Sequence, residues 1–97
     1  MYYFPILSLH HRNDFLITVL VKCLDIPDSA AYDHQGVQLF DCRPYQQNQH
    51  FFLDAQNRIH IMGKCLDVPK GEVVNNNLLQ LFRCHGQASQ QFALVPI

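Results

Sequence analysis

Short runs of apolar residues alternate with turn-forming residues along the whole chain. Residues 15–21 are almost all apolar and predict a buried strand that leads into Cys23. Residues 1–9 predict an edge strand or an extended lead, and residues 10–14 predict a polar turn. Further strands are predicted at residues 37–40, 51–53, 59–61, 65–68, 79–82 and 92–97. Because no helical apolar period persists, the pattern predicts an all-β barrel or sandwich without helices longer than a turn.

One stretch of the sequence occurs twice. Residues 22–27 read Lys-Cys-Leu-Asp-Ile-Pro, and residues 64–69 read Lys-Cys-Leu-Asp-Val-Pro, 42 positions later. The segment 37–42 returns at the same interval as the segment 79–84. Self-similarity at a fixed interval indicates repeated supersecondary units that bury their apolar faces against one another. We therefore expect a single domain over residues 1–97, with a lead-in of residues 1–21, a first repeat of residues 22–63 and a second repeat of residues 64–97.

Composition narrows the classes of function. The chain has 97 residues, of which 48% are hydrophobic and 15% charged, and this indicates one small globular domain. Its net charge is −1 and its seven Lys and Arg are scattered, which disfavours nucleic acid as a partner. No apolar run approaches the roughly 18 residues of a membrane span. No secretory signal is recognised, so we interpret the chain as mature, trimmed or a fragment.

The four cysteines have the same spacing in both repeats, 19 positions from Cys23 to Cys42 and from Cys65 to Cys84. The close cysteine pairs of zinc sites do not occur, so we predict no metal site. Pairing within each repeat treats the two copies equivalently, and this predicts the disulfides Cys23–Cys42 and Cys65–Cys84. Four buried free thiols are the alternative. Each bridge would stabilise the fold by about 3 kcal/mol, and such bridges suit a secreted protein or the lumen of the secretory pathway.

Taken together, these patterns resemble the repeat of the ricin B-type lectins. The order Cys-Leu-Asp, Gln-Leu-Phe-x-Cys and a Gln-x-Phe that resembles the family's Gln-x-Trp occurs in residues 22–54 and 64–95. Phe51 and Phe92 stand where most members have tryptophan, and we expect both in the core. The resemblance implies a β-trefoil with intra-repeat disulfides and one potential sugar pocket per repeat. It also implies a carbohydrate-binding module with no catalysis and no cofactor.

A β-trefoil has three repeats, and this chain supplies two of them and a fraction. The resemblance therefore implies one of three arrangements: a truncated domain, a degenerate trefoil with an unrecognisable first repeat, or a part that completes itself by association. A homo-oligomer or the domains of a parent protein would be the partners in that association.

The sugar site is predicted from the chemistry of the repeat. An ionised carboxylate on a loop after a half-cystine can accept two charge-assisted hydrogen bonds from vicinal hydroxyls. Amides add donors and acceptors, and an aromatic ring can stack on the C–H face of a pyranose. By the resemblance, the first-choice sugar-binding residues are Asp25, Gln38, Phe40, Asn48 and Gln49. The second and weaker set is Asp67, Gln80, Phe82 and Gln90, with Ser89 where the pattern has Asn.

Other roles are open for several of these residues. Asp25 and Asp67 could instead cap turns, and Gln49 and Gln90 are expected to serve the fold by bonding backbone groups. The dispersed histidines and carboxylates form no constellation that predicts an enzyme. We interpret the chain as a lectin for galactose or N-acetylgalactosamine on glycans. The alternative is a sugar-silent β-trefoil that serves as a protein-interaction or scaffolding piece of a larger toxin or glycosyltransferase.

Overall fold

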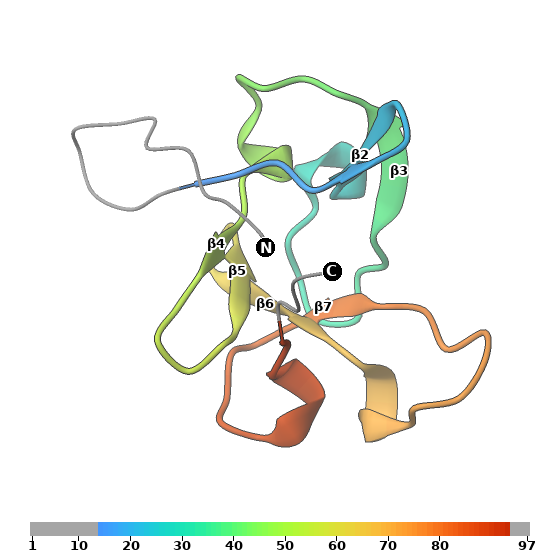
Figure 1. Cartoon of the computed structure of the whole chain (residues 1–97), viewed down its shortest axis with the longest axis vertical. Helices are drawn as coiled ribbons and strands as arrows, with labels where there is room; N and C mark the ends of the chain where they lie inside the picture. The colour runs from blue at the N-terminus through green and yellow to red at the C-terminus, as the bar shows by residue number, and fades with distance from the viewer. Residues whose placement is uncertain (1–13, 94–97) are drawn as a thin grey trace.

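The computed structural model describes residues 14–93 and shows an all-β fold with short strands (Figure 1). The strands are β1 Thr18–Val19, β2 Lys22–Asp25, β3 Gln38–Asp41, β4 Phe52–Leu53, β5 Ile59–Ile61, β6 Lys64–Asp67 and β7 Gln80–Phe82. Each helix in this part of the chain is a single 3₁₀ turn: η1 Pro27–Ser29, η2 Gln47–Gln49, η3 Pro69–Gly71 and η4 Ala88–Gln90. The predicted fold class and the predicted lack of longer helices are confirmed within these residues.

The strands form two antiparallel sheets, one of β1, β2 and β3 and one of β4, β5, β6 and β7. The same register occurs in both. In the first sheet, Asp25 lies opposite Gln38 and Cys23 lies opposite Phe40. In the second sheet, Asp67 lies opposite Gln80 and Cys65 lies opposite Phe82. Because partners in a ladder lie side by side, each repeat brings its aspartate next to its strand glutamine.

The predicted buried strand over residues 15–21 is wrong in both extent and burial. Only Thr18–Val19 forms a strand, and Leu20 and Val21 are 95% and 84% exposed. Leu20 has a φ of 56° and lies in the tight turn between β1 and β2, as Met62 with a φ of 51° lies between β5 and β6. The apolar run hid this turn because it contains none of the glycine or asparagine residues that usually mark positive φ.

The other predicted strands lie within about one or two residues of their observed positions, as expected for element ends. Phe51 is an exception, because it forms an isolated bridge with Phe15 just before β4. Residues 92–93, the start of the predicted last strand, are not in a strand. The rest of that strand, the lead over residues 1–9 and most of the turn over residues 10–14 lie outside the described residues.

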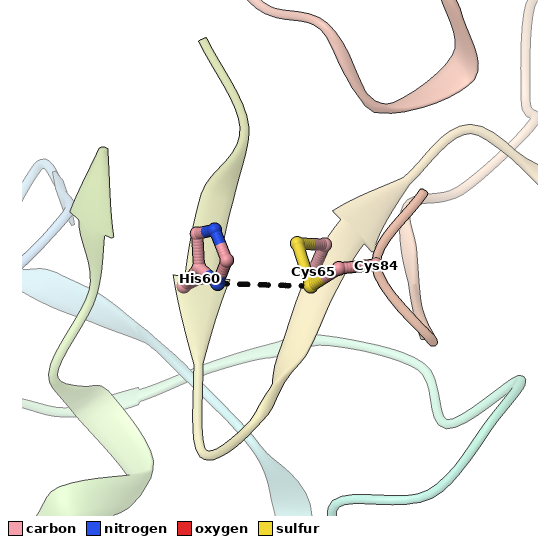
Figure 2. A group of neighbouring side chains, drawn as sticks. All are labelled: His60, Cys65 and Cys84. Atoms are coloured by element: carbon pink, nitrogen blue, oxygen red, sulfur yellow. Dashed lines mark hydrogen bonds between the residues drawn. A yellow bond between two sulfur atoms is a disulfide. The ribbon is translucent and has the colours of Figure 1, made fainter. Parts of the chain in front are cut away.

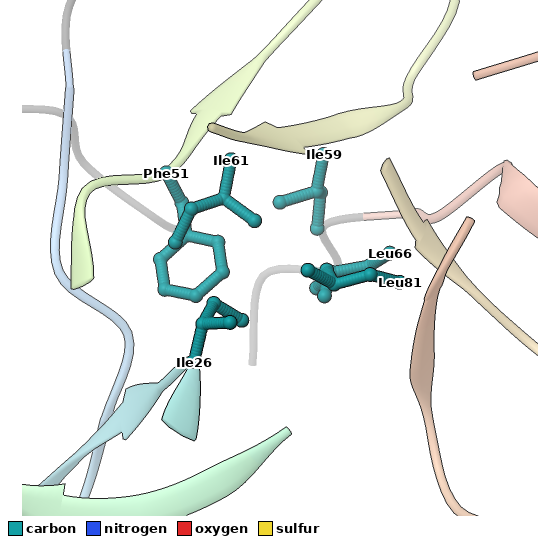
Figure 3. Close-up of a cluster of buried hydrophobic side chains, with 6 residues drawn as sticks. All are labelled: Ile26, Phe51, Ile59, Ile61, Leu66 and Leu81. Carbon is teal, nitrogen blue, oxygen red and sulfur yellow. The ribbon is translucent and has the colours of Figure 1, made fainter. Parts of the chain in front are cut away.

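The core lies between the two sheets (Figure 3). Its buried side chains come from both repeats: Ile26, Phe51, Ile59, Ile61, Leu66 and Leu81. Phe51 is fully buried, which confirms its predicted core placement, whereas Phe92 is partly buried and packs against the cluster. Each such side chain contributes about 1.5–3 kcal/mol when fully buried, and the cluster therefore holds the two repeats together.

The loop that follows η1 crosses from the first repeat to the second. His34 N donates to Leu81 O at 2.8 Å, and Leu81 N donates to Gln35 O at the same distance. The Asp33 carboxylate accepts hydrogen bonds from Lys64 Nζ at 2.8 Å and from Arg83 N at 2.9 Å. The hydrogen bond from Lys64 is the main cause that lowers the pKa of the Asp33 carboxyl below its ordinary value. This loop is therefore fixed against β7.

Both predicted disulfides, Cys23–Cys42 and Cys65–Cys84, are formed. The four cysteines all lie in the described part of the chain and none is free, so the alternative of four thiols is wrong. His60 Nδ1 lies 3.6 Å from Cys84 Sγ (Figure 2). Although His60 and the two cysteines are close enough to hold a metal ion, the two sulfurs are bonded to each other and leave only the imidazole as a ligand.

Asp54 is the hub of a small polar cluster next to this disulfide. Its carboxylate accepts a hydrogen bond from His60 Nε2 and another from Arg58 Nε, both at 2.7 Å. Burial works against ionisation, but the hydrogen bonds from His60, Arg58 and Gln56 hold the pKa of Asp54 well below its ordinary value. The ring of Phe52 stacks on His60 with a centroid distance of 4.5 Å. The cluster therefore fixes the hairpin of β4 and β5.

Candidate functional site

Each repeat carries one pocket that contains its aspartate. The first pocket has a volume of about 230 Å³ and is lined by Asp25, Asp28, Ser29, Gln38, Phe40, Arg43, Gln46 and Asn48. The second pocket has a volume of about 460 Å³ and is lined by His34, Asp67, Lys70, Gly71, Gln80, Phe82, His85, Gln87, Ala88 and Ser89. The predicted residues of each set, other than Gln49 and Gln90, therefore come together in one pocket per repeat.

Asp25 lies at the base of the first pocket and is only 2% exposed. Three side-chain amides donate to its carboxylate: Gln38 Nε2 to Oδ1 at 2.9 Å, Gln49 Nε2 to Oδ2 at 2.8 Å and Asn48 Nδ2 to Oδ2 at 3.2 Å. These donors are side-chain amides and not backbone N–H groups. Because a carboxylate has about four lone-pair positions, one remains for a ligand hydroxyl.

Gln49 and Gln90 are fully buried beneath the two pockets. Gln49 Oε1 accepts from Arg43 N at 2.7 Å, and its Nε2 also donates to Asp41 O at 2.9 Å. Gln90 makes the equivalent pair of contacts, with His85 N at 2.8 Å and Arg83 O at 2.9 Å. Both glutamines therefore bond backbone groups, as expected of residues that serve the fold, and their place among the sugar-binding residues stays a prediction. Gln49 is also one of the donors that orient the Asp25 carboxylate.

Phe40 and Asn48 give the first pocket its other two surfaces. Phe40 is 40% exposed, and the guanidinium carbon of Arg43 lies 4.9 Å from its ring centroid. Asn48 is buried, and its Nδ2 donates to Asp25 Oδ2 and to Ile26 O. Because both partners are acceptors, they identify the atom that faces them as the amide nitrogen and the other atom as Oδ1. That Oδ1 has no hydrogen-bond partner within residues 14–93. A buried acceptor without a partner costs about 1–3 kcal/mol, which favours a hydroxyl or water beside it.

Asp67 occupies the base of the second pocket and is 4% exposed. Gln80 Nε2 donates to its Oδ2 and Ser89 Oγ donates to its Oδ1, each at 2.9 Å. Ser89, which stands where the pattern has Asn, thus contacts the Asp67 carboxylate directly. Asp67 nevertheless has two such side-chain donors in the described structure, whereas Asp25 has three.

Sequence reasoning missed the charged and imidazole groups on the pocket walls. Lys70 lines the second pocket at the position that corresponds to Asp28 in the first, 42 residues earlier. An alignment of the two repeats shows this correspondence between Asp28 and Lys70. His34 had no such signal, because it belongs to the first repeat and lines the pocket of the second. Its ring lies 5.2 Å from that of Phe82 and its Nδ1 lies 3.3 Å from Gln80 Oε1.

Comparisons with known proteins agree with this architecture. Residues 16–96 match the model of the ricin-type beta-trefoil lectin domain. The chain therefore belongs to the ricin-type β-trefoil lectin family, whose domains bind carbohydrate. No curated protein matches the chain. In the described residues no helix is long and apolar enough to cross a membrane.

Two solved structures show the fold. The designed threefold-symmetric protein ThreeFoil is similar with a TM-score of 0.68 and 22% identity, over 78% of this chain and 58% of that one. The β-trefoil lectin of Vibrio vulnificus hemolysin/cytolysin, solved with N-acetyl-D-lactosamine bound, has a TM-score of 0.61 and 20% identity, over 76% and 54%. The fold is thus a β-trefoil, and the chain spans less than two thirds of either structure.

Proposed function

We propose that this protein is a lectin that binds galactose or N-acetylgalactosamine on glycans through its two pockets, without catalysis. One observation carries the proposal. In both repeats a buried aspartate is held by a strand glutamine at 2.9 Å and lies in a pocket lined by the phenylalanine two positions after that glutamine. The choice of sugar rests on the family resemblance and is supported by a fold neighbour solved with a disaccharide that contains galactose.

The chemistry of the first pocket suits a neutral sugar. The Asp25 carboxylate has a lone-pair position left after its three amide donors, and a hydrogen bond to an ionised acceptor is stronger than one between neutral groups. Asn48 Nδ2, which donates to Asp25 Oδ2, helps to orient that carboxylate. The exposed face of Phe40 can pack on the C–H patch of a pyranose ring. These groups hold the sugar by its hydroxyls and orient its apolar face.

A single pocket of this kind binds weakly. A monosaccharide has about 12 heavy atoms, and roughly 0.3 kcal/mol per atom gives about −4 kcal/mol, which corresponds to a near-millimolar Kd. Two pockets on one chain raise the effective affinity only for glycans that reach both. We therefore expect clustered or branched glycans to bind more tightly than free monosaccharides.

The alternative is a sugar-silent β-trefoil that serves as a protein-interaction or scaffolding piece of a toxin or glycosyltransferase. The near-complete burial of Asp25 and Asp67, with their hydrogen bonds made inside the protein, favours it. A silent domain would keep both aspartates for stability and show no response to any sugar.

The two disulfides favour an oxidising location, so we propose that the protein is secreted or resides in the lumen of the secretory pathway. Expression with a thiol-reactive mass label added before lysis tests this. Fully oxidised cysteines support the proposal, and labelled thiols contradict it.

Retention on immobilised galactose, followed by a glycan array, tests the proposed function. The oxidised chain is compared with the double variant Asp25→Asn and Asp67→Asn, which keeps the shape of both side chains and removes their charge. We expect retention of the wild-type chain, elution by free galactose and little retention of a folded double variant. A chain that binds no glycan, or a double variant that binds as well as wild type, contradicts the proposal.

A further inference from the structure

We infer that the second pocket takes an anionic saccharide, a sugar that carries a sulfate ester or a carboxylate, while the first takes a neutral one. This inference rests on the proposal that the pockets bind sugars. It starts from a difference between two sites that share their aspartate, their strand glutamine and their phenylalanine.

The difference lies on the rim, where the two repeats carry opposite charges at one position. Asp28 lines the first pocket and Lys70 lines the second, and the two are 42 residues apart, the interval of the repeat. Their backbones have the same left-handed conformation, with φ values of 55° and 58°. Both side chains therefore leave the 3₁₀ turn in the same direction relative to the pocket, one with a carboxylate and the other with an ammonium group.

Two imidazole side chains also line the second pocket. His34 and His85 both contact Phe82, with ring centroids 5.2 Å and 6.0 Å from the phenylalanine ring. His85 Nε2 also lies 3.7 Å from Asp67 Oδ1, so its ring is directed toward the base of the pocket. An imidazole N–H can donate a hydrogen bond to an anion.

The charges of the lining residues follow from these contacts. In the first pocket Asp25 and Asp28 carry −2 and Arg43 carries +1, which sums to −1. In the second pocket Asp67 carries −1 and Lys70 carries +1, which sums to zero. The second pocket is also twice as large, at about 460 Å³ against about 230 Å³, and has room for a substituent beside the sugar ring.

The geometry assigns a part to each group. Asp67 and Gln80 hold the sugar hydroxyls, and Phe82 lies under the ring. Lys70, with His34 and His85, faces the acidic substituent. The same saccharide in the first pocket would place its anion beside Asp28, where like charges repel.

The test is a titration of the oxidised chain, observed by ¹H–¹⁵N NMR, with lactose, a sulfated lactose and a sialylated lactose at about pH 6 and low salt. In the second pocket, we expect at least one of the two anionic ligands to bind more tightly than lactose, by about fivefold or more. The affinities for the sulfated and the sialylated lactose show whether the pocket prefers a sulfate ester or a carboxylate. High salt should reduce the preference, because it screens exposed charges.

Three variants make the test specific. Lys70→Asp places the residue of the first repeat in the second pocket and should bring the ratio of anionic to neutral affinity to about one or below. Asp28→Lys should give the first pocket part of that preference. Lys22→Asp changes the net charge of the chain by the same amount as Lys70→Asp, at a position outside both pockets, and should leave the ratio unchanged.

The outcomes separate this inference from the proposed function. If lactose binds the second pocket and neither anionic ligand binds better, the inference is wrong and the proposed function stands. If Lys70→Asp keeps the full preference, the inference is also wrong. If no saccharide binds either pocket, both fail together.

Discussion

The imidazole ring of His34 lies 5.2 Å, centroid to centroid, from the ring of Phe82, although the two residues belong to different repeats. The second pocket is therefore built by both repeats. The wall that His34 provides is held in place by Asp33, whose carboxylate bonds Lys64 Nζ and Arg83 N. The second repeat therefore does not supply all the residues that line its pocket, whereas the first pocket is lined by the first repeat alone.

Loss of the Asp33 anchor should weaken ligand binding at the second pocket and spare the first. Asp33→Ala removes the acceptor for Lys64 Nζ and Arg83 N, so the loop that carries His34 can move away from Phe82. We expect several-fold weaker binding at the second pocket in an NMR titration that follows the Gln80 side-chain amide. The control is Asn75→Ala, at the corresponding exposed position of the second repeat. Equal loss in both pockets would contradict a local role for this loop.

Asp54 should make the stability of the fold sensitive to acid. Its pKa is lowered in the folded state, so its contribution is fully present above the unfolded value, which is about 3.9, and is lost as pH falls through the folded pKa. Asp54→Asn removes the charge that His60 and Arg58 bond, and it should cost about 1.5–3 kcal/mol at pH 7.

Urea denaturation from about pH 7 down to about pH 2 measures this effect. The difference in free energy of unfolding between wild type and Asp54→Asn should shrink as the pH falls. Glu72→Gln, a change of the same kind at an exposed position, should have almost no effect. A difference that stays constant over the whole range would mean that ionisation of Asp54 does not stabilise the fold.

Gln49 should be needed for the fold rather than for direct contact with a ligand. Gln49→Met keeps its volume but leaves Arg43 N and Asp41 O without their buried partner and removes one donor from Asp25. We expect a loss of about 2–4 kcal/mol of stability by chemical denaturation. Gln47→Met, two positions earlier and exposed, should stay within about 0.5 kcal/mol of wild type. Equal effects of the two substitutions would contradict the buried role.

The chain should associate in solution. The chain exposes large apolar side chains in the β1–β2 turn and in the loop after η3, and exposed strand edges and apolar patches favour association. These side chains are Leu20, Val21, Val73, Val74 and Leu78. Light scattering after size-exclusion chromatography should give a dimer or a higher oligomer, or denaturation should show a marginally stable chain. A stable monomer at high concentration would show that the chain closes its own barrel.

Much of the fold could be predicted from the repeated segment. The recurrence of Lys-Cys-Leu-Asp and the equal cysteine spacing predicted both disulfides. The register that pairs each aspartate with its strand glutamine was not predicted, and the structure shows it in both sheets. The turn at Leu20 could not be predicted. Its positive φ is imposed by the pairing of β1 with β2 and not by the residue type.

The candidate site was predicted only in part. Local chemistry identified Asp25, Phe40 and Asn48, which the structure brings into one pocket. It could not separate residues that face a ligand from Gln49, which lies one position after Asn48 and is turned inward by the 3₁₀ geometry of η2. Nor could it place His34, whose role depends on a contact between segments 48 residues apart.

The most direct measurement of the central claim is a ¹H–¹⁵N NMR titration of the oxidised chain with galactose, repeated on Asp25→Asn and on Asp67→Asn. We predict a Kd near the millimolar range and shifts of the residues that line the pockets, above all Gln38 and Phe40. Loss of charge-assisted hydrogen bonds costs about 1.5–3 kcal/mol, so Asp25→Asn should abolish the response in the first pocket. Asp67→Asn should change the binding of this neutral sugar much less. Pocket residues that do not respond in the wild-type chain at tens of millimolar galactose, or an Asp25→Asn variant that binds as wild type does, would contradict the account.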